Sequence, residues 1–161
     1  MSGSGHRRAD VEVSTVVDAS PDATWQVVAD PTAMSGLTVE CTEMQWTGSS
    51  RRPEVGARFR GRNRSGWRRW TTMCTIVDYE PGRRVAWDVR LGPVDVARWG
   101  YTVSPGDDEG TTVLTEDFTD HRPRLVRATG RLSRGVSDTA AHNRANMTAT
   151  LERVRSQVQR G

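Results

Sequence analysis

The chain has 161 residues, 35% of them hydrophobic, a size that suits one domain with its own core. All 23 basic residues are arginine, and the 20 acidic residues interspersed with them leave a net charge of only +3. The sequence has no run of about 18 apolar residues and no apolar segment near its N-terminus, which argues against a membrane span and a secretion signal. We expect a cytoplasmic protein with a flexible leader over residues 1–9 and a single domain over residues 10–161.

The first predicted elements are a strand and two short helices. Apolar and polar residues alternate over residues 11–17, which is the period of a half-buried strand. Ser20 followed by Pro21 is a strong helix start, and Trp25 and Val28 then share one face of the helix. Pro31 ends this helix, and residues 31–36 are expected to form one or two further helical turns.

Six strands are predicted next, separated by short turns rich in glycine, proline and serine. Short connections between strands imply hairpins and therefore an antiparallel meander. Within the strands, apolar and aromatic residues share one face and arginines lie on the opposite face, as in a sheet with one solvated side. The predicted strands cover residues 38–47, 55–64, 67–79, 83–91, 94–104 and 111–118.

The C-terminal segment changes to a helical period, with one apolar stripe over about six turns. The long helix is the only element that can cover the aromatic face of the sheet. Because a strongly twisted sheet cannot contact a straight helix along its whole length, we expect a cavity between them. Residues 119–135 bridge the last strand to this helix. The stripe consists of Val136, Ala140, Asn143, Met147, Leu151, Val154 and Val158.

Other features weigh against several classes of function. Cys41 and Cys74 are interpreted as reduced core thiols, and the sequence has no metal-ligand cluster, nucleophile elbow, phosphate loop or dinucleotide fingerprint. We therefore expect no metal and no cofactor. Alternate arginines from Arg58 to Arg64 form a basic stripe, but no aromatic residues are interleaved on that face, so a solvated surface is favoured over a nucleic-acid partner.

Short segments spread over nearly the whole chain carry a family resemblance: DASPDATW (18–25), ADP (29–31), GARFRGRNR (56–64), RWTT (69–72), YEPGRR (79–84), RWGY (98–101), AHNR (141–144), Met147 and TLER (150–153). Together they resemble the START-like helix-grip (SRPBCC) superfamily, and specifically its bacterial polyketide cyclase/dehydrase-type branch. The resemblance implies an α+β fold in which a seven-stranded curved antiparallel sheet wraps around the long C-terminal helix. Relatives often carry Trp-Ser-Pro-Glu-Cys after the second helix, whereas residues 37–41 here read Leu-Thr-Val-Glu-Cys.

The inner face supplies the aromatic candidates for a ligand site. Trp70, Trp87, Trp99 and Tyr101 lie on neighbouring strands, where they either pack as core or line a pocket for flat rings. Met147 faces them from the long helix, on its apolar stripe.

Three polar residues are the other candidates. Asn63 and Asn143 are either structural hydrogen-bonding residues or ligand anchors. Glu116 falls between inward-facing Leu114 and Phe118, where it is either an acid or base with a raised pKa or the partner of an arginine; Val113 and Thr115 offer a rival register.

The two histidines near these residues are weaker candidates. His142 falls on the solvent side of the helical wheel. His121 lies just beyond the last strand, where the sequence does not place it relative to the pocket.

Two classes of function follow from these residues. The leading hypothesis is binding of a hydrophobic small molecule, aromatic or polyketide- or lipid-like, in the internal cavity. The alternative is a polyketide cyclase, aromatase or dehydratase that folds a poly-β-keto chain into a reactive shape, with Glu116 and Tyr101 as candidate catalytic groups. A weaker third hypothesis is a partner surface on residues 119–135. The sequence leaves open whether exposed strand edges pair in a homodimer.

Overall fold

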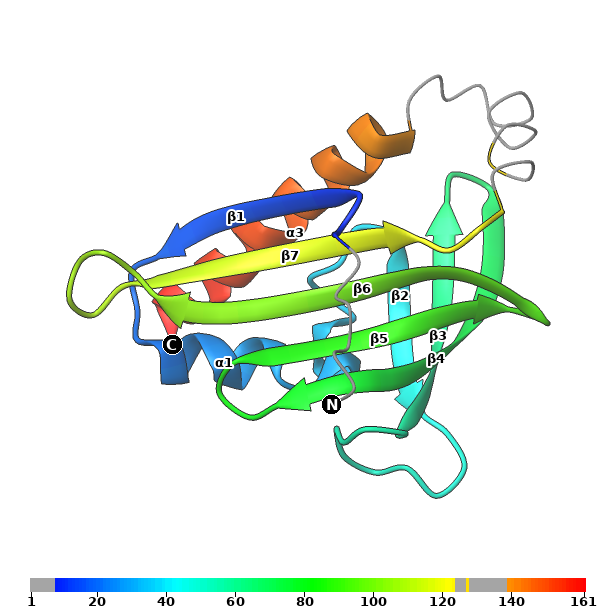
Figure 1. Ribbon diagram of the computed structural model, residues 1–161, viewed down its shortest axis with the longest axis horizontal. Coiled ribbons are helices and arrows are strands. Elements are labelled where there is room, and N and C mark those ends of the chain that lie inside the picture. Colours follow the sequence, from blue (N-terminus) through cyan, green and yellow to red (C-terminus); the bar gives the residue numbers. More distant parts are fainter. Residues whose placement is uncertain (1–7, 124–126, 128–138) are drawn as a thin grey trace.

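The computed structural model describes residues 8–123, 127 and 139–161 and shows a curved sheet with a long helix across one face (Figure 1). The seven strands lie in the order β1-β7-β6-β5-β4-β3-β2, and every neighbouring pair is antiparallel. The predicted α+β helix-grip architecture is therefore confirmed. The elements are β1 (Val11–Val17), α1 (Pro21–Val28), η1 (Pro31–Met34), β2 (Cys41–Trp46), β3 (Arg58–Ser65), β4 (Arg68–Glu80), β5 (Arg84–Leu91), β6 (Val94–Pro105), β7 (Thr112–Asp120) and α3 (Thr139–Arg160).

The short helix α1 begins as its capping residues dictate. The Ser20 side chain accepts a hydrogen bond from the backbone N–H of Ala23 at 3.1 Å, and Pro21 occupies the first helical position. Trp25 and Val28 are buried on the inner side of α1, as predicted. The helix is thereby anchored at the end of the sheet where α3 finishes (Figure 1).

Two strands begin later than the sequence pattern indicates. β2 starts at Cys41 rather than at residue 38, because the Thr38 hydroxyl donates to the Cys41 carbonyl and holds residues 38–41 in a turn. β3 starts at Arg58 rather than at residue 55, because Gly56 has a φ of 91° in the left-handed region that interrupts an extended chain. The predicted leader falls mostly on residues 1–7, and the predicted bridge mostly on 124–126 and 128–138; both stretches lie outside the described residues.

The helix α3 lies along β1 and contacts α1 near its C-terminal end. Met147, Leu151, Val154 and Val158 are all buried, which confirms the predicted apolar stripe from Met147 onward, whereas Ala140 is exposed and Asn143 is half-buried. Val136 is outside the described residues. Among the helices of the described chain, none is long and apolar enough to cross a bilayer.

The burial of the inward residues agrees with the predicted faces of the sheet. Leu91, expected to share a side with Val89, is the last residue of β5, beside the β5–β6 turn, and is 46% exposed. On β7, Leu114 and Phe118 are buried whereas Val113 and Thr115 are only partly buried, which settles the register that the sequence left open.

The outer face carries an ion-paired arginine network that depends on a glycine. Arg84 donates to Asp117 at 2.7 Å and to Asp78 at 3.0 Å. A Cβ atom at Gly100 would lie 2.7 Å from both the Arg84 guanidinium and the Asp117 carboxylate. Gly100 is therefore required because only a residue without a side chain leaves room for Arg84 to cross β6 and reach Asp117.

Candidate functional site

The most unusual polar group of the interior is the pair formed by Glu116 and Tyr101. The two residues are direct cross-strand neighbours on β7 and β6, and both face inward because they alternate with the outward residues of their strands. The Tyr101 hydroxyl donates a hydrogen bond to Glu116 Oε1 at 2.9 Å. Glu116 is 4% exposed and Tyr101 is 1% exposed. The sequence-based alternative of a Glu116–arginine ion pair is not what the structure shows.

The second carboxyl oxygen of Glu116 has no partner. Oε2 is buried and makes no hydrogen bond to any described residue. Burial raises the pKa of Glu116 from 4.5 to about 8, although the hydrogen bond from Tyr101 partly opposes this. Burial also raises the pKa of Tyr101 well above its ordinary value. At neutral pH the pair is therefore a neutral carboxylic acid and a neutral phenol, and Oε2 is the atom left to donate a hydrogen bond.

The surroundings of this pair are apolar. On β7 the inward-facing residues run Leu114, Glu116, Phe118, and the two apolar neighbours belong to different core clusters. Leu114 packs in the larger cluster together with Leu151, and Phe118 packs in a smaller cluster together with Met147. Glu116 therefore lies at the boundary between the two clusters. An unpartnered polar atom at such a boundary is a position where an incoming ligand would gain a hydrogen bond.

The aromatic residues of the inner face divide into two groups. Trp46, Phe59, Trp87 and Tyr101 form a continuous row in which consecutive ring centroids lie 5.8 Å apart. Trp87 and Tyr101 are buried in this row and pack as core. The side chains of these two residues therefore serve mainly as core packing. A ligand could contact them only by lying against this aromatic row.

The second group lies nearer to the β3–β4 end and is less covered. Asn63 and Trp70 are cross-strand neighbours, and both are only half-buried although they belong to the inward face. The Asn63 amide donates to the Thr72 hydroxyl at 3.1 Å, which supports its structural role. Trp99 is also half-buried, and its ring lies 4.7 Å from that of Phe118. Asn63 and Trp70 are therefore partly accessible near the β3–β4 turn, and Trp99 is partly accessible on β6 beside its buried cross-strand partner Trp87.

A small cavity borders this region at the N-terminal half of α3. Its volume is about 120 Å³, and Asn143 lines it from α3 while Val11 and Phe118 line it from the sheet. Asn143 is half-buried, which fits the position predicted for it on the helix. Phe118 lines this cavity and is the inward neighbour of Glu116 along β7, whereas Glu116 itself does not line it. The remaining lining residues are Asp10, Asp120, Arg122, Arg127 and Ala140.

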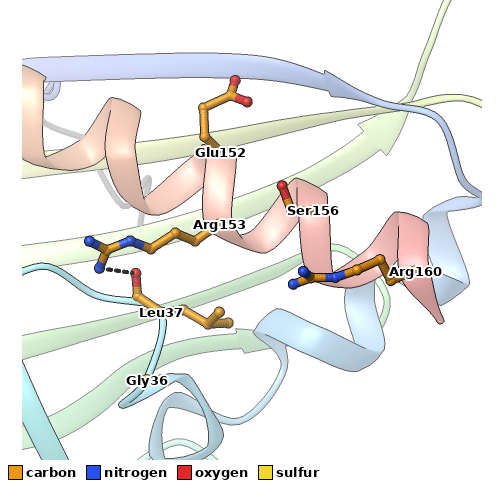
Figure 2. Close-up of a pocket in the computed structure, with 6 residues that line it drawn as sticks. All are labelled: Gly36, Leu37, Glu152, Arg153, Ser156 and Arg160. Carbon is orange, nitrogen blue, oxygen red and sulfur yellow. Dashed lines mark hydrogen bonds between the residues drawn. The ribbon is translucent and has the colours of Figure 1, made fainter.

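A second, wider hollow is a surface groove on the other side of α3 (Figure 2). It has a volume of about 410 Å³ and lies between α3 and the segment that follows η1. The Arg153 guanidinium donates to the backbone carbonyls of Leu37 and Thr38 at 3.3 Å and 3.2 Å. These hydrogen bonds link α3 to residues 37–38, which lie in the segment that differs from the Trp-Ser-Pro-Glu-Cys of relatives. None of the predicted site residues lies in this groove.

Other predicted residues have structural positions. His142 is on the exposed side of α3, as expected, and its Nε2 lies 3.0 Å from Glu40, a contact that the sequence analysis missed. His121 is half-buried, and its backbone N–H donates to the Val96 carbonyl. Cys41 and Cys74 are free thiols, and burial raises their pKa values to about 11 and about 12, so neither is a reactive thiolate.

Comparison with known proteins gives one family and several similar folds. The family model for polyketide cyclase / dehydrase and lipid transport matches residues 8–159. No curated protein matches the sequence. A conserved protein from Geobacillus kaustophilus has a similar structure, with a TM-score of 0.67, 15% identity, and coverage of 92% of this chain and 94% of that one.

Two further solved structures are similar to this chain. A polyketide-cyclase-like protein from Corynebacterium glutamicum has 26% identity and a TM-score of 0.56, with 93% of this chain and 88% of that one covered. DynU16, a protein in the dynemicin biosynthetic locus, has 18% identity and a TM-score of 0.61, with 92% of this chain and 46% of that one covered. Since the family model spans almost the whole chain and the fold agrees, the chain belongs to the polyketide cyclase/dehydrase and lipid transport family of helix-grip proteins.

Proposed function

We propose that the protein binds a hydrophobic, ring-containing small molecule between the inner face of the sheet and the N-terminal half of α3. The observation that carries this proposal is the neutral Glu116–Tyr101 pair, whose free oxygen Oε2 is buried among apolar and aromatic side chains. An orphaned buried oxygen lowers stability by about 1–3 kcal/mol unless something satisfies it. A ligand with a carbonyl or hydroxyl oxygen would do so.

The position of the ligand follows from which inward residues are accessible. Asn63 and Trp70 are half-buried near the β3–β4 turn, Trp99 is half-buried on β6, and Asn143 lines the cavity that Phe118 borders. A cavity of about 120 Å³ is smaller than a typical pocket for a drug-sized ligand. The Phe118 ring must therefore move aside for a multi-ring ligand to extend from this cavity to Glu116.

The proposal is tested by ligand-induced stabilisation. A panel of aromatic ketones, quinones and fatty acids is screened by thermal shift and by quenching of tryptophan fluorescence. We expect apolar compounds with a neutral carbonyl to stabilise the protein, and we expect Glu116→Leu to weaken their binding more than it weakens binding of the matching hydrocarbons. Glu109→Gln, in the exposed β6–β7 turn, is the control. A panel in which no apolar compound shifts the unfolding temperature would contradict the proposal.

The alternative function is catalysis on a poly-β-keto chain, which the name of the matching family favours. The neutral Glu116 carboxyl could then donate its proton to a substrate carbonyl as a general acid. In that case Glu116→Gln abolishes turnover of a poly-β-keto substrate while leaving its affinity nearly unchanged. Equal losses in affinity and turnover would instead assign Glu116 a binding role only.

A further inference from the structure

The β3–β4 hairpin ends in an exposed tryptophan surrounded by arginines. Trp67 is 87% exposed, and every residue from Arg64 to Arg69 is exposed. Tryptophan is on average a highly buried residue, so a side chain this accessible at the end of a hairpin needs an explanation. The Arg68 guanidinium lies 5.6 Å from the centroid of the Trp67 ring, which places a positive charge directly beside the indole.

The charge of this hairpin is not compensated within the described chain. No aspartate or glutamate occurs anywhere between residues 55 and 77, whereas six arginines do. Arg62 pairs with Glu43, but Arg64, Arg68 and Arg69 make no ion pair with any described acidic residue. Arg58 and Arg60, further along β3, also make no ion pair with a described acidic residue, but the other three uncompensated charges are gathered around the tryptophan.

The strand register makes this arrangement unfavourable for the isolated protein. Arg64 and Arg69 are direct cross-strand partners in the β3–β4 ladder, so their side chains share a face. Like charges directly opposite each other on a sheet are destabilising. An external anionic surface would remove this repulsion, and the neighbouring indole would enter a half-apolar environment at the same time.

We propose that this hairpin end, formed by residues 64–69, docks on an anionic lipid membrane surface. Indole rings concentrate at the boundary between lipid headgroups and acyl chains, and basic side chains are attracted to anionic headgroups. The hairpin lies on the side of the molecule away from α1 and the C-terminus (Figure 1). It also carries Asn63 and Trp70, so docking places the accessible end of the inner face near the bilayer. The docking surface stands independently of what the interior binds.

Vesicle sedimentation tests the proposal with the full chain. The wild-type protein is expected to sediment with vesicles of equimolar phosphatidylcholine and phosphatidylglycerol, and not with pure phosphatidylcholine. Each arginine near an anionic surface adds roughly five-fold in affinity, so Arg64→Gln, Arg68→Gln and Arg69→Gln combined should weaken binding by on the order of 100-fold. Binding should also weaken as salt rises.

The β2–β3 loop at the opposite end of β3 supplies the matched control. Arg51→Gln combined with Arg52→Gln removes two exposed arginines there and is expected to leave vesicle binding within about two-fold of wild type. Trp67→Ala should abolish the blue shift of tryptophan emission that accompanies binding. Equal binding to both vesicle types, equal loss in the control variant, or binding of single-stranded oligonucleotides in place of vesicles would each overturn the proposal.

Discussion

Replacing Glu116 by glutamine should change how stability depends on pH. The folded-state pKa of Glu116 is about 8, above its ordinary value of 4.5, so the folded protein holds a proton that the unfolded chain has released between those two values. Stability therefore falls as pH rises through this window, by up to about 1.4 kcal/mol per pH unit. From pH 5 to pH 8 the loss from this one group amounts to roughly 3 to 4 kcal/mol.

Glutamine has the shape of the neutral acid but cannot ionise. Urea denaturation of the wild type and of Glu116→Gln at pH 5, 6, 7 and 8 isolates the contribution of Glu116, because all other groups titrate in both proteins. We expect the free energy of unfolding of the variant to rise steadily relative to that of the wild type as the pH increases. The control Glu109→Gln should instead track the wild type, because its side chain is exposed. A stability difference that stays constant from pH 5 to pH 8 would refute the neutral, buried carboxyl.

Three further variants test how the site is held in place. Tyr101→Phe removes the only side-chain hydrogen bond that Glu116 makes within the described chain, so it should raise the pKa of Glu116 further. It should also lower stability by about 1–3 kcal/mol, measured by urea denaturation across pH. Gly100→Ala should lower stability by about 1–3 kcal/mol, measured by thermal unfolding, because the added Cβ displaces the Arg84 ion pairs. Gly36→Ala is the control and should have little effect in the same measurement, because a Cβ at this position meets no neighbour. Ser20→Ala removes the cap of α1 and should lower stability by about 1 kcal/mol.

The elements with a regular period were predictable from the sequence. Alternation identified the strands and their inward faces, and Ser20 with Pro21 identified the start of α1, because these signals are local. The exposure of Leu91 was not predictable, because the pattern does not report that this last residue of β5 lies beyond the covered part of the sheet. The late starts of β2 and β3 were missed because turns set by Thr38 and Gly56 interrupt the extended chain.

The candidate site was predictable only as a set of inward residues. The sequence placed Glu116 and Tyr101 on one face, but it left open whether glutamate would meet tyrosine or arginine, because strand register decides this. The sequence pattern suggested one pocket lined by four aromatic residues. In the structure Trp87 and Tyr101 pack within the aromatic row, and Trp70 and Trp99 remain half-buried. Packing density, which no sequence pattern reports, makes that distinction.

Indole N–H resonances in a proton–nitrogen correlation spectrum test the central claim most directly, because the chain has six tryptophans at distinct positions. Titration with an aromatic ketone that stabilises the protein should shift the signals of Trp70 and Trp99 and leave that of Trp67 unchanged. A spectrum in which only Trp67 responds, or in which Trp70 and Trp99 stay fixed while the ketone binds, would place the ligand outside the sheet–helix interior and contradict the account.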